Sequence, residues 1–177
     1  MNKIIITGFM GSGKTTVAEA LARRLGCGFI DLDTLITEGA GRAPAEIIEC
    51  DGEPAFRQIE TQALRGVLDN NEDCVIALGG GAWTVAENRE LIAGRQCLTV
   101  WLDAPFGLCW ERITAGGAGR PLARDRESAQ RLYRARRASY ELADFRITVG
   151  AHSAESELAS LIESGLERRR SQTVDDP

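Results

Sequence analysis

The chain has 177 residues, of which 44% are hydrophobic and 27% are charged, a composition that suits one folded domain with a full hydrophobic core. Its net charge of −5 argues against nucleic acid as the main partner, and no apolar run approaches the roughly 20 residues that a membrane span needs. Five cysteines without a C-x-x-C pair, beside one histidine, disfavour a zinc site and indicate thiols in a reducing compartment, so we expect a cytoplasmic protein.

Apolar runs of strand length alternate with amphipathic stretches of helix length. The first run, Ile4–Thr7, predicts a buried strand, and the apolar spacing that follows predicts a helix over 15–25. The remaining strands are expected at 29–31, 75–78, 97–102 and 146–149. The remaining helices are expected within 33–50, where two short ones fit, and at 53–68, 86–93, 105–113, 126–142 and 154–168. This alternation predicts an α/β fold in which helices cover both faces of a parallel sheet.

The sequence shows no internal repeat and no linker, so residues 1–168 are expected to form a single domain. Residues 114–124 are rich in glycine and arginine and predict a mobile loop. The polar residues 169–177 are expected to be a disordered tail.

A phosphate-binding loop is predicted at Gly8–Thr15, which fits G-x-x-x-x-G-K-[ST] directly after a strand and at the start of a helix. The glycines let backbone N–H groups point at a phosphate, and the helix adds its positive dipole end. Lys14 can reach the β- and γ-phosphates, and the Thr15 hydroxyl can bind Mg²⁺, which prefers oxygen ligands. The alternative is a glycine-rich turn without a ligand.

Two carboxylates, Asp31 and Asp33, stand at the end of the second predicted strand. Because residues i and i+2 of a strand share a face, both are expected to point the same way at the carboxyl edge, where ligands of open α/β sheets bind. One could hold metal-bound water, and the other could accept the proton of an acceptor hydroxyl. The alternative is that Asp33 merely caps a helix beginning near Thr34.

Further candidates for an acceptor site follow along the chain. Arg57 and Glu60 are three residues apart on one predicted helix and can pair, either as a surface salt bridge or to hold Arg57 for an anionic substrate. Gly79–Gly81, straight after the third strand, can let the backbone approach a small ligand or can form a flexible turn. The glycines at 116, 117 and 119 with Arg120 predict either a lid that excludes water from phosphates or a surface loop.

Together these segments resemble the shikimate kinase family. The matching pieces, in the family's order, are GFMGSGKTT at 8–16, DLD at 31–33, GEPAFRQIE at 52–60, GGGA at 79–82, RPL at 120–122 and RRASYELAD at 136–144, so the resemblance covers about 1–150. It implies a three-layer α/β/α P-loop kinase fold, like that of nucleoside monophosphate kinases, with a five-stranded parallel sheet of order 2-3-1-4-5. It also implies a monomeric enzyme that transfers the γ-phosphoryl of ATP to the 3-hydroxyl of shikimate with Mg²⁺, without a nucleic-acid or membrane partner.

The resemblance implies roles for individual residues on the acceptor side. Asp33 would bind the substrate hydroxyls and act as the base. Arg57 and Arg136 would clamp the shikimate carboxylate, and the backbone of Gly79, Gly80 and Gly81 would contact the substrate.

On the nucleotide side, Lys14 and Arg120 would act on the phosphates during catalysis, Thr15 and Asp31 would lie at the metal, and Arg112 would stack near adenine. The residues that would hold the nucleotide are Gly11, Ser12, Gly13, Lys14, Thr15, Thr16, Arg112 and Arg120.

The sequence departs from the family pattern at two places. The segment from Arg136 to Tyr140 lacks the usual proline, and the adjacent Arg137 leaves open which arginine faces the substrate. The lid has Gly119 where an acidic residue is usual and Ala123 where a second leucine is common. The alternatives are another small-molecule kinase of this fold, such as a gluconate or nucleotide kinase, and a non-catalytic nucleotide-binding module.

Overall fold

The computed structural model describes residues 3–116 and 125–174. Within them, five parallel strands form one sheet of order β2-β3-β1-β4-β5, which confirms the predicted topology. Its strands are β1 (Ile4–Thr7), β2 (Gly28–Asp31), β3 (Cys74–Ala77), β4 (Leu98–Asp103) and β5 (Phe145–Thr148).

The central strand β1 lies between β3 and β4, and Ile5 pairs with Ile76 on one side and Thr99 on the other. All four residues of β1 are buried, as expected for a parallel strand that is covered on both faces.

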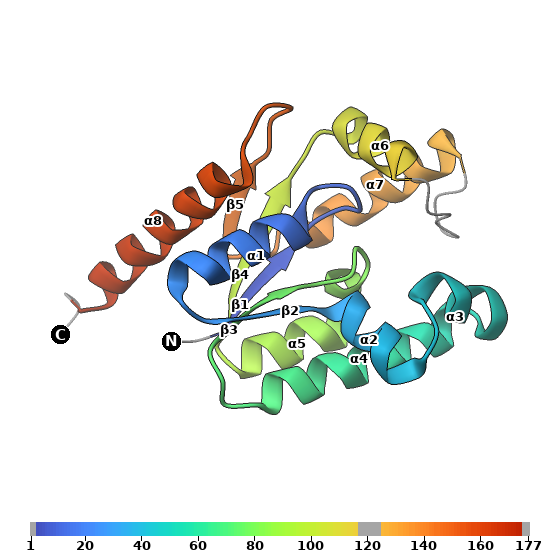
Figure 1. Ribbon diagram of the computed structural model, residues 1–177, viewed down its shortest axis with the longest axis horizontal. Helices are drawn as coiled ribbons and strands as arrows, with labels where there is room; N and C mark the ends of the chain where they lie inside the picture. Colours follow the sequence, from blue (N-terminus) through green and yellow to red (C-terminus); the bar gives the residue numbers. More distant parts are fainter. Residues whose placement is uncertain (1–2, 117–124, 175–177) are drawn as a thin grey trace.

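Helices cover both faces of the sheet (Figure 1). On one side lie α1 (Lys14–Leu25) and α8 (Glu155–Val174), which pack against each other. On the other side lie α4 (Glu53–Asp69) and α5 (Ala86–Gly94). The predicted three-layer arrangement is therefore present.

The carboxyl edge of the sheet leads into the remaining helices. After β2 come α2 (Leu32–Ala40) and α3 (Pro44–Asp51), and after β4 come α6 (Phe106–Ala115) and then α7 (Arg126–Tyr140). A short 3-10 helix, η1 (Ala82–Thr84), follows β3 and contacts α7. These segments surround the edge where ligands are expected.

Most element bounds differ from the predictions by one or two residues, and three differences are of note. Strand β2 ends at Asp31 as predicted, but Leu32 already begins α2, so Asp33 lies on a helix. The helix η1 was not predicted. Helix α8 continues to Val174, past the expected end near residue 168, because no proline or glycine interrupts residues 166–174, so the prediction of a disordered tail was wrong for residues 169–174.

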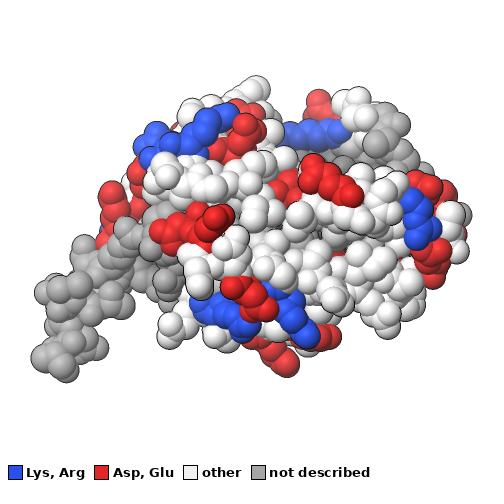
Figure 2. Space-filling model, turned by 60° about the horizontal axis from the view of Figure 1, so that its bottom comes forward, with Lys and Arg blue, Asp and Glu red and all other residues white. Residues whose placement is uncertain are grey.

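Within the described ranges, no helix combines the length and apolarity that a membrane crossing requires. The face shown in Figure 2 carries acidic and basic side chains interspersed over its surface.

Candidate active site

The loop between β1 and α1 is built around glycines. Gly8, Gly11 and Gly13 have φ angles of 144°, 76° and 93°, which residues with a side chain rarely adopt. A Cβ on Gly11 would also lie 2.6 Å from the carbonyl oxygen of Cys109 in α6. Gly13 provides no side-chain cap to α1, so the first N–H groups of this helix are available to an anion, as the phosphate-loop prediction requires.

Lys14 lies buried beneath this loop. Its side chain is 9% exposed, and Nζ donates a 3.0 Å hydrogen bond to the carbonyl oxygen of Phe9, across the loop. The hydroxyl of Thr16, two residues further along α1, donates to the carbonyl oxygen of Gly13 at 3.0 Å. The ammonium group is thus held against the loop that the phosphates are expected to bind.

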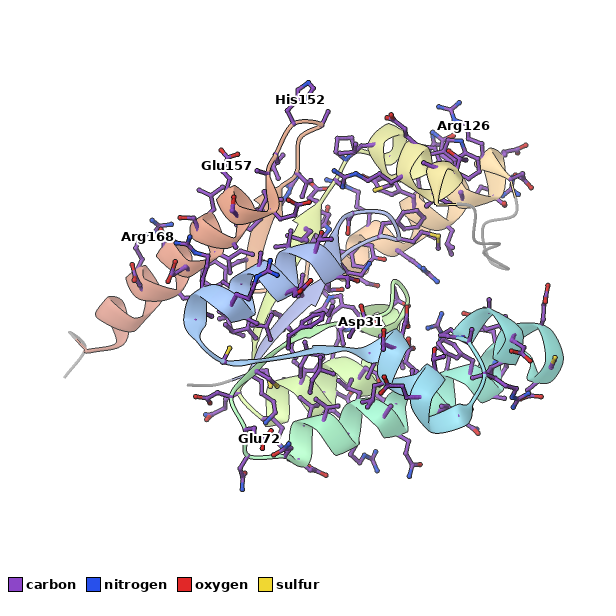
Figure 3. The ribbon with its side chains drawn as sticks, viewed as in Figure 1. Asp31, Glu72, Arg126, His152, Glu157 and Arg168 are labelled. Carbon is purple, nitrogen blue, oxygen red and sulfur yellow. The ribbon has the colours of Figure 1, made fainter. Side chains whose placement is uncertain are left out.

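Thr15 and Asp31 place two hard oxygen ligands side by side. The Thr15 hydroxyl donates to Oδ2 of Asp31 at 2.7 Å, and Figure 3 shows Asp31 at the junction of β2 and α2. Among the described residues, no group of three or more His, Cys, Asp or Glu could hold a metal. Two oxygens fit Mg²⁺, which binds through few protein ligands and completes its shell with phosphate oxygens and waters.

The prediction that Asp33 shares one face of a strand with Asp31 was wrong. Asp33 lies in the first turn of α2, and it is Asp31, through Oδ1 and the backbone N–H of Thr34 at 3.1 Å, that caps the helix. The proposed cap by Asp33 is therefore wrong as well. Asp33 nevertheless lies at the carboxyl edge, with Oδ1 2.6 Å from the position that a Cβ on Gly79 would occupy.

Arg57 is held by two carboxylates of its own helix. Its Nη1 pairs with Oε2 of Glu60 at 2.7 Å, as predicted, and its Nη2 pairs with Oε1 of Glu53 at 2.8 Å. The Glu53 partner was missed, although a spacing of four residues could have indicated it. Burial raises the pKa of Glu60, against the lowering effect of Arg57. Oε1 of Glu60 has no hydrogen-bond partner among the described residues.

The glycine turn after β3 brings these acceptor-side groups together. A Cβ on Gly79 would lie 2.8 Å from Oε1 of Glu60, in addition to the contact with Asp33. A Cβ on Gly81 would lie 2.3 Å from Nη2 of Arg57. Any side chain at these two positions would displace Asp33, Glu60 or Arg57, so the turn needs glycine for packing.

Arg136 reaches the same turn from α7. Its Nη1 donates to the carbonyl oxygen of Gly80 at 3.1 Å, and the residue is 7% exposed. Burial lowers its pKa. Glu53 and Glu60, the two carboxylates that pair with Arg57, also act electrostatically on Arg136, so it shares their negative charge with Arg57.

Arg137, in contrast, belongs to a separate network. It donates to both carboxylate oxygens of Asp103 in β4, at 2.9 and 3.3 Å, and its guanidinium lies 5.0 Å from the ring centre of Trp101. Arg146 in β5 also donates to Asp103, at 2.9 Å through Nε. The geometry therefore associates Arg136 with the glycine turn and Arg137 with β4 and β5.

A cavity of about 290 Å³ adjoins the phosphate loop. Arg112 lines it and donates to the carbonyl oxygen of Gly11 at 3.3 Å. The loop between β5 and α8 closes the other side, a contribution that no sequence motif indicated. The cavity is lined by Gly11, Ser12, Gly13, Thr16, Val17, Arg112, Val149, Ser153, Glu155 and Leu158.

The predicted lid lies mostly beyond what the structure describes. Residues 114 and 115 belong to α6. Arg120, with the rest of 117–124, lies outside the described residues, so its role stays a prediction.

Comparison with known proteins identifies close relatives over nearly the whole chain. The model of the family described as shikimate kinase matches residues 10–167. A shikimate kinase from Geobacter sulfurreducens is 41% identical over 165 residues, which cover 90% of each chain. One from Cereibacter sphaeroides is 40% identical over 155 residues, covering 86% of this chain and 76% of the relative.

A solved structure gives the same result. Shikimate kinase from Acinetobacter baumannii in complex with shikimate superposes with a TM-score of 0.88 at 33% sequence identity, covering 96% of this chain and 94% of the other.

Proposed function

The chain belongs to the shikimate kinase family, and we propose that it transfers the γ-phosphoryl group of ATP to the 3-hydroxyl of shikimate, giving shikimate 3-phosphate and ADP. The observation that carries this proposal is the buried Arg136, which lies at the glycine turn beside Arg57, where two guanidinium groups share the carboxylates of Glu53 and Glu60. A substrate carboxylate would add negative charge between them.

The acceptor would bind at the turn of Gly79, Gly80 and Gly81. Arg57 and Arg136 would hold its carboxylate from α4 and α7, the two helices that reach this turn. Asp33 would accept a hydrogen bond from the 3-hydroxyl and take its proton as the new P–O bond forms. Because the transition state of phosphoryl transfer is loose, this proton leaves late, and Asp33 does not need to be a strong base.

The nucleotide would bind across the phosphate loop and the adjoining cavity. The backbone of Gly11, Ser12 and Gly13 and the start of α1 would hold the phosphates, with Lys14 neutralising charge between the β- and γ-phosphates. The adenine would enter the cavity beside Arg112, and Thr16 lines the same cavity.

Mg²⁺ would be held by Thr15 and, through water, by Asp31, and when bound it would neutralise phosphate charge. Arg120, on the predicted lid, would lie over the phosphates and keep water from the γ-phosphoryl group.

The proposal also covers the domain, the location, the oligomeric state and the partners of the protein. Residues 1–168 would form the kinase domain of a cytoplasmic monomer without a nucleic-acid or membrane partner. The five cysteines are free thiols, which fits a reducing compartment.

A panel of acceptors tests the reaction. ADP release would be measured with Mg-ATP and shikimate, gluconate, a nucleoside monophosphate or no acceptor, with Lys14→Ala as the blank. We expect ADP with shikimate alone and its loss in the blank. ADP formed with another acceptor would overturn the substrate assignment, and ATP binding without ADP formation would favour a non-catalytic module.

A further inference from the structure

One carbonyl oxygen, that of Gly80, accepts two hydrogen bonds from α7. The hydroxyl of Tyr140 donates to it at 2.5 Å, and Nη1 of Arg136 donates to it at 3.1 Å. The two donors are four residues apart and therefore lie one above the other on the same face of α7. The four-residue spacing of Arg136 and Tyr140 therefore lets both side chains donate to the same acceptor.

The end of α7 that carries Tyr140 is fixed from two further sides. The ring of Tyr140 stacks on Trp101 of β4, with ring centroids 6.1 Å apart and an interplanar angle of 25°. Nε1 of Trp83 in η1 donates to the carbonyl oxygen of Ser139 at 2.8 Å. Tyr140 is 2% exposed, so its hydroxyl has little freedom to leave the carbonyl oxygen of Gly80.

The phenol is also a neutral neighbour for a buried cation. Burial raises the pKa of Tyr140 to about 12, so the hydroxyl keeps its proton at neutral pH. A carboxylate in its place would neutralise Arg136 and remove its attraction for an anionic ligand. A phenol orients the guanidinium without cancelling its charge.

We propose that Tyr140 is a positioning residue that sets the selectivity of the enzyme for acceptors bearing a carboxylate. It shares the carbonyl of Gly80 with Arg136, and so holds the guanidinium and the glycine turn in one fixed relation without adding negative charge beside the guanidinium. This inference rests on the proposed function, because it takes shikimate as the acceptor.

Tyr140→Phe is the variant that tests this role, since it keeps the ring that stacks on Trp101 and removes only the hydroxyl. Tyr133→Phe is the matched control. Tyr133 lies seven residues earlier on α7, and its hydroxyl donates at 3.0 Å to a different backbone carbonyl oxygen, that of Ala104. Thermal unfolding of both variants would establish that they fold.

The measurement is the ratio of kcat/KM for shikimate to that for its uncharged carboxamide, with KM for ATP recorded in parallel. We expect Tyr140→Phe to lower this ratio about 10-fold, through a higher KM for shikimate, because a lost hydrogen bond at a charged site costs about that factor. Its KM for ATP should stay unchanged. Tyr133→Phe should keep the wild-type ratio.

Two results would overturn the inference while leaving the proposed function intact: an unchanged ratio in Tyr140→Phe, or the same fall in both variants. If the wild-type protein does not phosphorylate shikimate at all, the proposed function and the inference fail together.

Discussion

The carboxylate of Glu60 is fully buried and pairs with the guanidinium of Arg57 across 2.7 Å. Burial raises the pKa of Glu60, and Arg57 opposes this rise more strongly than Arg136 does. The folded protein therefore binds a proton at Glu60 more tightly than the unfolded chain does, and this carboxyl group contributes less to stability as the pH rises from its unfolded pKa towards its folded pKa.

Arg57→Met should strengthen this pH dependence, because it leaves the buried carboxylate without its nearest cation. We expect the variant to lose about 3 kcal/mol of unfolding free energy at pH 8 and much less at pH 5, where Glu60 can hold a proton. Denaturant unfolding at the two pH values would measure this loss of unfolding free energy. The double variant Arg57→Met with Glu60→Gln should lose the difference between pH 5 and pH 8; a difference that persists would contradict the assignment to Glu60.

Arg136 and Arg137 should behave in opposite ways despite being neighbours. Arg136→Met should lower kcat/KM for shikimate about 100-fold, since a charged hydrogen bond contributes up to about 3 kcal/mol. It should not destabilise the protein, because it removes a charge that burial disfavours. Arg137→Met should leave KM for shikimate unchanged, since it removes only one partner of Asp103. Steady-state kinetics and thermal unfolding of the two variants would measure these effects. A loss of kcat/KM for shikimate in Arg137→Met but not in Arg136→Met would contradict the assignment.

Gly81→Ala should impair substrate binding more than folding. The added Cβ would lie 2.3 Å from Nη2 of Arg57, the end of a side chain that can move aside. We expect KM for shikimate to rise at least about 10-fold, the effect of misplacing one charged contact. Gly66→Ala, near the end of α4 where a Cβ would meet nothing within 4 Å, is the control and should add about 0.5 kcal/mol of stability with unchanged KM. Equal kinetics in the two variants would disprove the steric argument.

Asp31→Asn should weaken the binding of Mg²⁺ while preserving the N-terminal cap of α2. Asparagine caps helices about as well as aspartate, but it offers no negative charge beside Thr15. The Mg²⁺ concentration for half-maximal activity should rise several-fold in titrations at fixed ATP. Asp125→Asn changes the corresponding cap of α7 and should leave the Mg²⁺ titration as in the wild type. An unchanged titration in Asp31→Asn would remove Asp31 from the metal site.

The sequence allowed the sheet and the phosphate loop to be predicted because both depend on local patterns. Apolar runs located each strand, and the glycines before Lys14 fit a loop whose conformation only glycine adopts readily. The strand order came from the resemblance to a family rather than from spacing alone, and the structure confirms it.

The segment Asp31–Asp33 shows why other parts were not predictable. An aspartate at the end of a strand can continue the strand or cap a following helix, and here the hydrogen bond to Thr34 decides for the helix. The shared acceptor of Arg136 and Tyr140 was hidden for a different reason: it is a backbone oxygen of Gly80, more than fifty residues away in sequence. Contacts of this kind arise from tertiary packing and leave no periodic signal.

The most direct test of the central claim is to identify the product by ³¹P nuclear magnetic resonance after incubating the protein with Mg-ATP and shikimate. We predict one new phosphomonoester signal, coupled to the proton at carbon 3 of the ring and formed in equal amount to ADP. Inorganic phosphate in place of this signal, or a phosphate coupled to a different ring proton, would contradict transfer to the 3-hydroxyl.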